Sequence, residues 1–221
     1  MKQFVVIGIG RFGSAVAKRL YKMGHDVLAI DTDEDEIQNI SDKVTHAVTA
    51  DASDENVLKS LGVRNFDVAV VGIGTDIQSS IITTVMLKEL GVKYVVAKAM
   101  NDLHAKVLLK VGADRVVFPE RDMGERVAHN LIATNIFEFI ELSPEFSIIE
   151  FAVPPNWVGK DLRELNLRVK YGVNVVAIKS INNDMMNAAP MAESEMHEDT
   201  VLVVLGSNEN LKRLEKKADL I

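Results

Sequence analysis

The sequence predicts an α/β protein, in which a doubly wound parallel sheet of the Rossmann type precedes a small α+β domain. Over the first 120 residues, short runs rich in Val, Ile and Ala alternate with longer amphipathic segments. A glycine-rich turn at residues 8–13 joins the first apolar run to the first helical segment. This alternation stops after Pro119. Near-continuous apolar strands separated by helices are typical of a parallel sheet that is covered on both faces.

The first domain can be divided into its elements in order. The strands that we expect cover residues 3–8, 26–31, 46–50, 67–73, 93–98 and 115–118. The helices between them begin near residues 11, 33, 53, 76 and 101. Gly24, Gly62 and Gly91 mark the ends of three of these helices, because glycine readily adopts the left-handed conformation that commonly terminates a helix.

Beyond residue 120 the pattern predicts a connector and then a second domain. A helical stretch covers residues 121–140 and is too long to be only the last crossover of the sheet. The remainder combines strand-like runs with short helices and a turn-rich stretch over 182–198. We therefore expect a Rossmann domain over residues 1–120, connecting helices over 121–140, and a C-terminal α+β domain over 141–221.

Composition limits the classes of function. The chain of 221 residues contains no cysteine, which excludes disulfides and thiolate metal sites and fits a reducing cytoplasm. Its formal net charge of -7 argues against a nucleic-acid partner, which requires a concentrated basic face. The N-terminus shows no signal peptide, and no apolar run approaches the ~20 residues needed to cross a bilayer. We expect a soluble chain that does not itself insert into a membrane.

The glycine-rich turn predicts a nucleotide site. Its sequence, Gly8-Ile9-Gly10-Arg11-Phe12-Gly13, matches G-x-G-x-x-G between a strand and a helix, which is the context that gives this motif its meaning. Gly8 permits the tight turn, Gly10 leaves room for a diphosphate, and Gly13 lets helix and strand pack closely. Free amides at the start of the helix attract phosphate oxygens. The alternative is that these glycines only shape a turn.

Asp31-Thr32-Asp33 follows the second strand at the same expected edge of the sheet. A carboxylate at Asp31 can accept hydrogen bonds from ribose hydroxyls. Asp33 either contacts the ribose as well or only caps the next helix. Because two acids would repel a 2′-phosphate, NADP is disfavoured.

Three further strands end at this edge with residues that we expect in the site, namely Asp51-Ala52-Ser53, Ile73-Gly74 and Lys98-Ala99. The first group lies where an adenine ring is expected, and Ser53 is also predicted to cap a helix. Lys98 either faces phosphate or is a solvated residue at a strand end.

Arg11 favours one class of nucleotide. A guanidinium between the second and third glycines complements a terminal phosphate better than a nicotinamide riboside, which favours ATP or ADP over NAD(H). The sequence contains no Walker A motif and no defensible catalytic set, so we expect no catalytic residues and no enzyme activity. The open alternatives are an NAD(H)-dependent dehydrogenase and a redox-sensing DNA-binding repressor.

Several segments together resemble the RCK (KTN/TrkA) family. Besides the glycine turn, they are residues 50–53 (ADAS), 61–67 (LGVRNFD), 112–120 (GADRVVFPE), 165–168 (LNLR) and 171–178 (YGVNVVAI). Within this family the chain is similar to cytosolic regulatory subunits of bacterial potassium transporters. A related domain that serves a different channel or transporter is the remaining alternative.

The resemblance implies a homo-octameric ring, a tetramer of dimers, which docks on a membrane subunit that conducts K+. It implies that ATP and ADP compete for the Rossmann site and thereby gate potassium transport. Arg11 would meet the terminal phosphate, Asp31 the ribose, and Asp51-Ala52 the adenine, although some relatives carry Asn in place of Asp51. Glu120 would help to bind a divalent cation, such as Mg²⁺ or Ca²⁺, between paired subunits.

The resemblance also implies a second ligand, cyclic di-AMP, at the dimer interface of the C-terminal domain. The positions that would bind it are Leu162, Leu167, Arg168, Asn174, Val175 and Pro190. Taken alone, these residues are ordinary core and turn residues.

Overall fold

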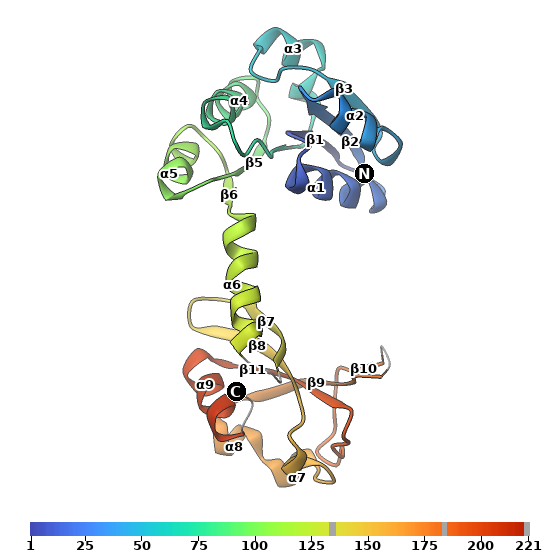
Figure 1. The fold of residues 1–221 in the computed structure, drawn as a ribbon, viewed down its shortest axis with the longest axis vertical. Helices are drawn as coiled ribbons and strands as arrows, with labels where there is room; N and C mark the ends of the chain where they lie inside the picture. Colours follow the sequence, from blue (N-terminus) through green and yellow to red (C-terminus); the bar gives the residue numbers. More distant parts are fainter. Residues whose placement is uncertain (133–135, 183–184, 219–221) are drawn as a thin grey trace. The chain divides into compact units, whose positions relative to one another are not determined.

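The fold is that of a computed structural model, which describes residues 1–132, 136–182 and 185–218. The chain divides into two compact units, Met1–Arg121 and Asp122–Ile221 (Figure 1). Each unit contains its own sheet, so each is described by itself.

Unit 1 contains a six-stranded sheet in which all neighbouring strands are parallel. Its strands are β1 (Gln3–Ile7), β2 (Asp26–Asp31), β3 (His46–Thr49), β4 (Val68–Val71), β5 (Tyr94–Lys98) and β6 (Arg115–Val117). The spatial order β3-β2-β1-β4-β5-β6 is that of a Rossmann fold. The predicted doubly wound sheet is confirmed.

The helices of unit 1 connect these strands. They are α1 (Arg11–Lys22), α2 (Glu34–Ile40), α3 (Glu55–Ser60), α4 (Ile77–Glu89) and α5 (Asp102–Lys110), with short 3-10 turns at Ser41–Lys43 and Val63–Asn65. Side-chain oxygens of Asp33, Asp54, Asp76 and Asn101 cap the starts of α2 to α5. The prediction that Ser53 caps a helix is wrong, because Asp54 accepts the amide of Asn56 and takes that role.

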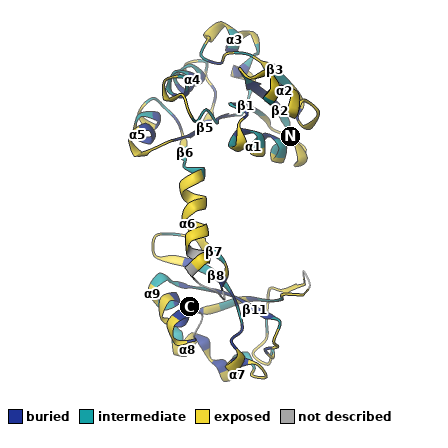
Figure 2. Cartoon of the chain, in the orientation of Figure 1, coloured by how far each residue is buried: buried dark blue, intermediate teal, exposed yellow. Residues whose placement is uncertain are grey.

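Both faces of this sheet are buried (Figure 2). Val6 belongs to one apolar cluster, whereas its neighbours Val5 and Ile7 belong to another. Because successive side chains of a strand point to opposite faces, these clusters are the two helix-covered layers.

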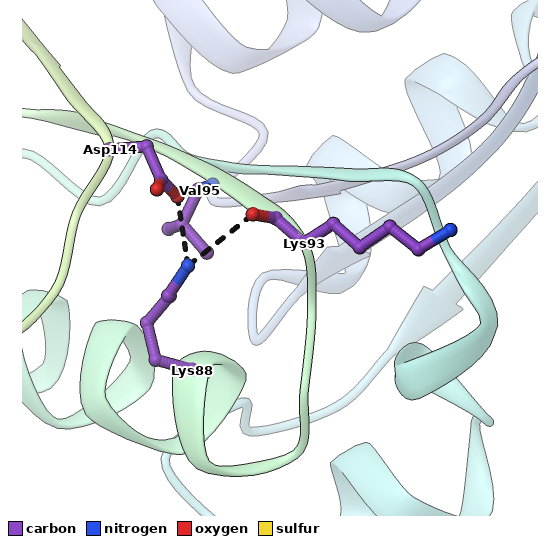
Figure 3. Close-up of polar contacts among 4 residues, drawn as sticks. All are labelled: Lys88, Lys93, Val95 and Asp114. Atoms are coloured by element: carbon purple, nitrogen blue, oxygen red, sulfur yellow. Dashed lines mark hydrogen bonds and ion pairs between the residues drawn. The ribbon is translucent and has the colours of Figure 1, made fainter.

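Asp114, just before β6, links three elements of unit 1 (Figure 3). Its Oδ2 accepts hydrogen bonds from the Lys88 Nζ at 3.0 Å and the Val95 amide at 2.7 Å. Lys88 lies on α4 and Val95 on β5, so this carboxylate fastens a helix to two neighbouring strands.

Unit 2 contains a five-stranded antiparallel sheet in the order β10-β9-β11-β8-β7. Its strands are β7 (Ile136–Glu141), β8 (Phe146–Ala152), β9 (Asn174–Ser180), β10 (Met186–Asn187) and β11 (Thr200–Ser207). Its helices are α7 (Leu162–Leu165), α8 (Leu167–Tyr171) and α9 (Asn208–Lys217), with a 3-10 turn at Pro155–Trp157. The predicted small α+β domain is confirmed. The fully buried Phe151 belongs to its core.

The connector differs from the prediction. Helix α6 covers Pro119–Ile132, and Ile136–Glu141 forms strand β7 rather than the end of a helix over 121–140. Strand β7 pairs with β8, where Phe139 lies opposite Ile149. Pairing with a neighbouring strand satisfies the backbone of this segment and outweighs any local helical preference. Residues 133–135 lie outside the described part of the chain.

Candidate functional site

A cavity of about 570 Å³ opens at the carboxyl ends of the strands of unit 1, where β1 and β4 lie side by side. Ligands of open α/β sheets bind at such a point, where the strand order reverses. The predicted site residues that line it are Gly8, Gly10, Arg11, Phe12, Asp31, Thr32, Asp33, Asp51, Ala52, Ser53, Ile73, Gly74, Lys98 and Glu120. The structure therefore gathers turns that are distant in the sequence around one space.

Two glycines of the first turn are required by close packing. Gly8 has a φ of +87°, and a Cβ there would lie 2.7 Å from the Ile73 amide nitrogen. A Cβ on Gly13 would lie only 1.9 Å from the carbonyl oxygen of Gly8. Gly13 does not line the cavity; it lets α1 start directly against the turn.

Gly10 is the N-cap of α1 and supplies no side-chain cap. Helices α2 to α5 each begin with a capping side chain, so α1 alone among these five leaves its first amides open. A Cβ on Gly10 would meet nothing within 4 Å. The uncapped helix start and the open space beside it lie in the cavity, and together they fit a phosphate group.

Asp31 braces the glycine turn. Its Oδ2 accepts the Ile9 amide at 2.5 Å, and its Oδ1 accepts the Asp33 amide at 2.9 Å. Each carboxylate oxygen retains a further lone pair that can accept a ribose hydroxyl. Asp33 accepts the amides of Asp35 and Glu36 and thus caps α2. Ile9 is fully buried and contributes its backbone to this arrangement rather than its side chain.

Two carboxylates lie near one another on another part of the lining. Asp51 accepts hydrogen bonds from the Ser53 hydroxyl at 2.6 Å and the Ser53 amide at 2.8 Å, and the hydroxyl bond is the main reason that the pKa of Asp51 is lowered. Asp76 caps α4, and the amide and hydroxyl of Ser79 lower its pKa. Both groups are therefore ionised and repel additional negative charge.

Lys98 and Glu120 form an ion pair, with Nζ and Oε1 2.5 Å apart. Of the two alternatives for Lys98, a solvated residue at a strand end is wrong, because only 9% of this residue is exposed. The hydrogen bond from Lys98 is the main cause that lowers the pKa of Glu120, and the charge of the nearby Arg11 contributes as well. We refer to Arg11 and Lys98 as the basic cluster of the cavity, and Glu120 lies beside it.

Some predicted residues serve the site indirectly, and some lining residues were not predicted. Ile9, Gly13 and Ala99 do not line the cavity, and Ala99 is buried. The polar and glycine lining residues that sequence reasoning missed are Glu36, Gly72, Thr75, Asp76, Ser79 and Thr83. Asp76 could have been predicted, because it lies in a strand-to-helix turn and all such turns of a parallel sheet that follow the strands lie at the same edge.

The site fits a nucleotide better than a metal ion alone. Its volume falls within the range of about 300–1,000 Å³ for ligand sites. Its basic cluster can bind phosphate, while Asp31 and Asp51 can accept hydrogen bonds from hydroxyl and amino groups. Among the described residues no three His, Cys, Asp or Glu side chains gather as metal ligands. A cation held by the Glu120 carboxylate would therefore need further ligands from outside these described side chains.

The residues predicted to bind cyclic di-AMP lie within unit 2. Leu167 is buried, and Leu162 and Val175 pack against the same core. Arg168 and Asn174 are exposed. The Leu162 amide donates to the Ser194 carbonyl and the Arg163 amide to the Ala192 carbonyl, which brings α7 close to the segment after Pro190.

No helix in residues 1–132, 136–182 and 185–218 is long and apolar enough to cross a bilayer.

Comparison with solved structures supports the fold. A structure described as the GsuK channel bound to NAD superposes with a TM-score of 0.67 at 19% identity, covering 97% of this chain and 39% of the channel chain. The crystal structure of the GsuK RCK domain superposes with a TM-score of 0.68 and covers 98% of this chain and 47% of that one. The chain therefore spans less than half of each of these two proteins.

Comparison with families and curated proteins identifies the chain more closely. The TrkA-N domain matches residues 4–119 and the TrkA-C domain residues 148–219. Ktr system potassium uptake protein C of Bacillus subtilis is 46% identical over 98% of this chain and 97% of its own length. Protein A of the same system is 44% identical in B. subtilis and 37% identical in Vibrio alginolyticus. The resemblance drawn from the sequence is confirmed: the chain belongs to the RCK (TrkA-N/TrkA-C) family, alongside the Ktr system potassium uptake proteins.

Proposed function

We propose that this protein is a nucleotide-sensing regulatory subunit of a Ktr-type potassium uptake system and not an enzyme. ATP and ADP would compete for the cavity of unit 1, and the bound nucleotide would set the activity of a membrane subunit that conducts K+. The protein would act at the cytoplasmic face of the membrane, as a homo-octameric ring built from four dimers. Its relatives named for Ktr potassium uptake support the assignment to this system.

One observation carries the nucleotide assignment. The open amide end of α1, Arg11 and Lys98 all belong to the lining of one cavity, and each is a partner for phosphate oxygens. The carboxylates of Asp31 and Asp51 line the same cavity and suit ribose hydroxyls and an adenine amino group. A molecule with a neutral, donor-rich end and an anionic end fits this distribution of charge.

A regulatory role follows from how binding energy is used. A ligand shifts an equilibrium between two shapes only by its difference in affinity for them. ATP and ADP share the adenosine and differ in the terminal phosphate. Arg11 and a cation at Glu120 would distinguish ATP from ADP if they contact the terminal phosphate of ATP in only one of the two shapes of the protein.

Calorimetric titration of the purified chain with ATP, ADP, NAD+ and NADH, with and without Mg²⁺, tests the proposal. We expect ATP and ADP to bind at one shared site, and Mg²⁺ to strengthen ATP only. A clear preference for NADH that is indifferent to Mg²⁺ would favour the alternative of an NAD(H)-binding protein. Turnover of NADH with any substrate would contradict a purely regulatory role.

Glu120→Gln tests the cation. The substitution removes the negative charge but retains the shape, so we expect Mg²⁺ or Ca²⁺ to lose most of its effect on ATP affinity. Binding of ADP should change little. Glu55→Gln is a matched control, because Glu55 forms an exposed ion pair with Lys59 and does not line the cavity. A cation dependence that survives in Glu120→Gln would show that the ion binds elsewhere.

We also propose that unit 2 binds cyclic di-AMP across a dimer. Arg168 is exposed and would contact a phosphate, whereas Leu162, Leu167 and Val175 lie in or against the core and would shape the surface. Titration of cyclic di-AMP into wild type and Arg168→Ala should show about tenfold weaker binding in the variant, a typical effect for a charged hydrogen bond. Unchanged binding by the variant would refute the assignment of Arg168.

A further inference from the structure

The ion pair between Lys98 and Glu120 is unequal in its exposure to solvent. The side chain of Lys98 is 11% exposed, whereas that of Glu120 is 64% exposed. Lys98 ends β5, and Glu120 lies in the first turn of α6. The ammonium is therefore held inside the cavity lining, while its carboxylate partner is largely exposed to solvent.

The ammonium has unused hydrogen-bonding capacity. A lysine provides three N–H donors. Within the described residues, the Glu120 carboxylate is the one protein acceptor in contact with Nζ, so two donors have no protein partner there. Lys98 lines the same cavity as Arg11 and Gly10. A largely buried cation with unfilled donors favours the arrival of an anion, and phosphate oxygens are strong acceptors.

Gly74 provides the space that the ammonium occupies. A Cβ built on Gly74 would lie 3.3 Å from the Lys98 Nζ and 3.7 Å from its Cε. Any larger residue at this position would crowd the lysine. The Lys98 ammonium therefore lies close to the turn that follows β4.

We propose that Lys98 is an exchangeable counter-ion of Glu120, which keeps a divalent cation off this carboxylate until a terminal phosphate binds and draws the ammonium to itself. The inference rests on the proposed function for the identity of the phosphate. While the pair is intact, Glu120 is neutralised and the nearby positive charge repels a dication. The flexible lysine stem can move its charge from one acceptor to another.

This exchange would couple the two ligands in a defined order. A nucleotide that places a phosphate at the basic cluster would recruit Lys98 and release Glu120 for the cation. A nucleotide whose phosphates end before the cluster would leave the pair intact and the cation site closed. No covalent step is involved, because the Lys98 ammonium only moves from one acceptor, the Glu120 carboxylate, to another, the phosphate.

Titration of Mn²⁺ into the full chain without nucleotide, followed by electron paramagnetic resonance, tests the exchange directly. We expect Lys98→Gln to bind Mn²⁺ at least fivefold more tightly than wild type. The double variant Lys98→Gln/Glu120→Gln should lose this gain. Lys88→Gln is the matched control, because it removes a lysine–carboxylate pair in the same domain but outside the cavity (Figure 3), and it should bind Mn²⁺ as wild type does.

The outcomes separate this inference from the proposed function. If Lys98→Gln binds Mn²⁺ no more tightly than wild type, or if the gain persists without Glu120, the exchange is wrong. If wild type binds neither ATP nor ADP, the proposed function fails, whereas the Mn²⁺ result in nucleotide-free protein still decides whether Lys98 shields Glu120. Lys98→Met retains the apolar stem and should show the same tighter binding of Mn²⁺. This second variant tests the prediction if Lys98→Gln does not fold.

Discussion

Gly13→Ala is expected to abolish nucleotide binding and to lower the free energy of unfolding by about 3 kcal/mol, at the upper end for overpacked sites. The added methyl group would lie 1.9 Å from the Gly8 carbonyl oxygen, and this backbone atom cannot yield as a flexible side chain would. The start of α1 must then move away from the turn, which displaces the amides that face the cavity. Urea denaturation monitored by circular dichroism measures the loss of stability.

Gly10→Ala provides the contrast within the same loop. Its Cβ would meet no atom within 4 Å, so we expect the free energy of unfolding to change little. Nucleotide binding should nevertheless weaken, because the methyl group occupies the space beside the open amides of α1. If both variants lost the same stability, the packing argument for Gly13 would be wrong.

Arg11→Ala is expected to weaken ATP binding by about 2 kcal/mol, or roughly thirtyfold in Kd, and ADP binding by much less. The reason is that Arg11 lines the cavity, where its charge acts on Glu120, and we expect it to meet the terminal phosphate that ADP lacks. Calorimetry with both nucleotides measures the difference.

Arg19→Ala is the matched control for this variant. Arg19 is exposed in the last turn of the same helix and does not line the cavity, so both nucleotides should bind as in wild type. Equal losses of ATP and ADP in Arg11→Ala would remove Arg11 from the discrimination of the terminal phosphate.

Much of the fold could be predicted because its signals are local. The apolar strands, the glycine turn and the acids that begin α2 and α3 each carry a short-range pattern. Strand β7 could not be recognised in this way, because its conformation depends on pairing with β8, which follows it in the chain. A pairing partner is a tertiary contact, and it overrides local preference.

The cavity was predicted in outline but not in its charges. Strand ends in a parallel sheet meet at one edge, so the turns that line it followed from the topology. The burial of Lys98 did not follow, because its partner Glu120 is 22 positions away and belongs to another element. A lysine at a strand end has the same local sequence pattern whether it is solvated or paired.

Under the proposed function, the hydrogen bonds of Asp31 bear on which change in nucleotide concentration the protein would sense. Its carboxylate accepts hydrogen bonds from the amides of Ile9 and Asp33, so contacts within the protein fix the loop around the position proposed for the ribose. ATP and ADP would meet the same preformed surface there and gain the same binding energy. The difference between them would arise at Arg11, Lys98 and Glu120. If ATP and ADP bind as proposed, the protein would respond to the proportion of the two nucleotides, and its activity would not change when the total adenylate concentration rises or falls.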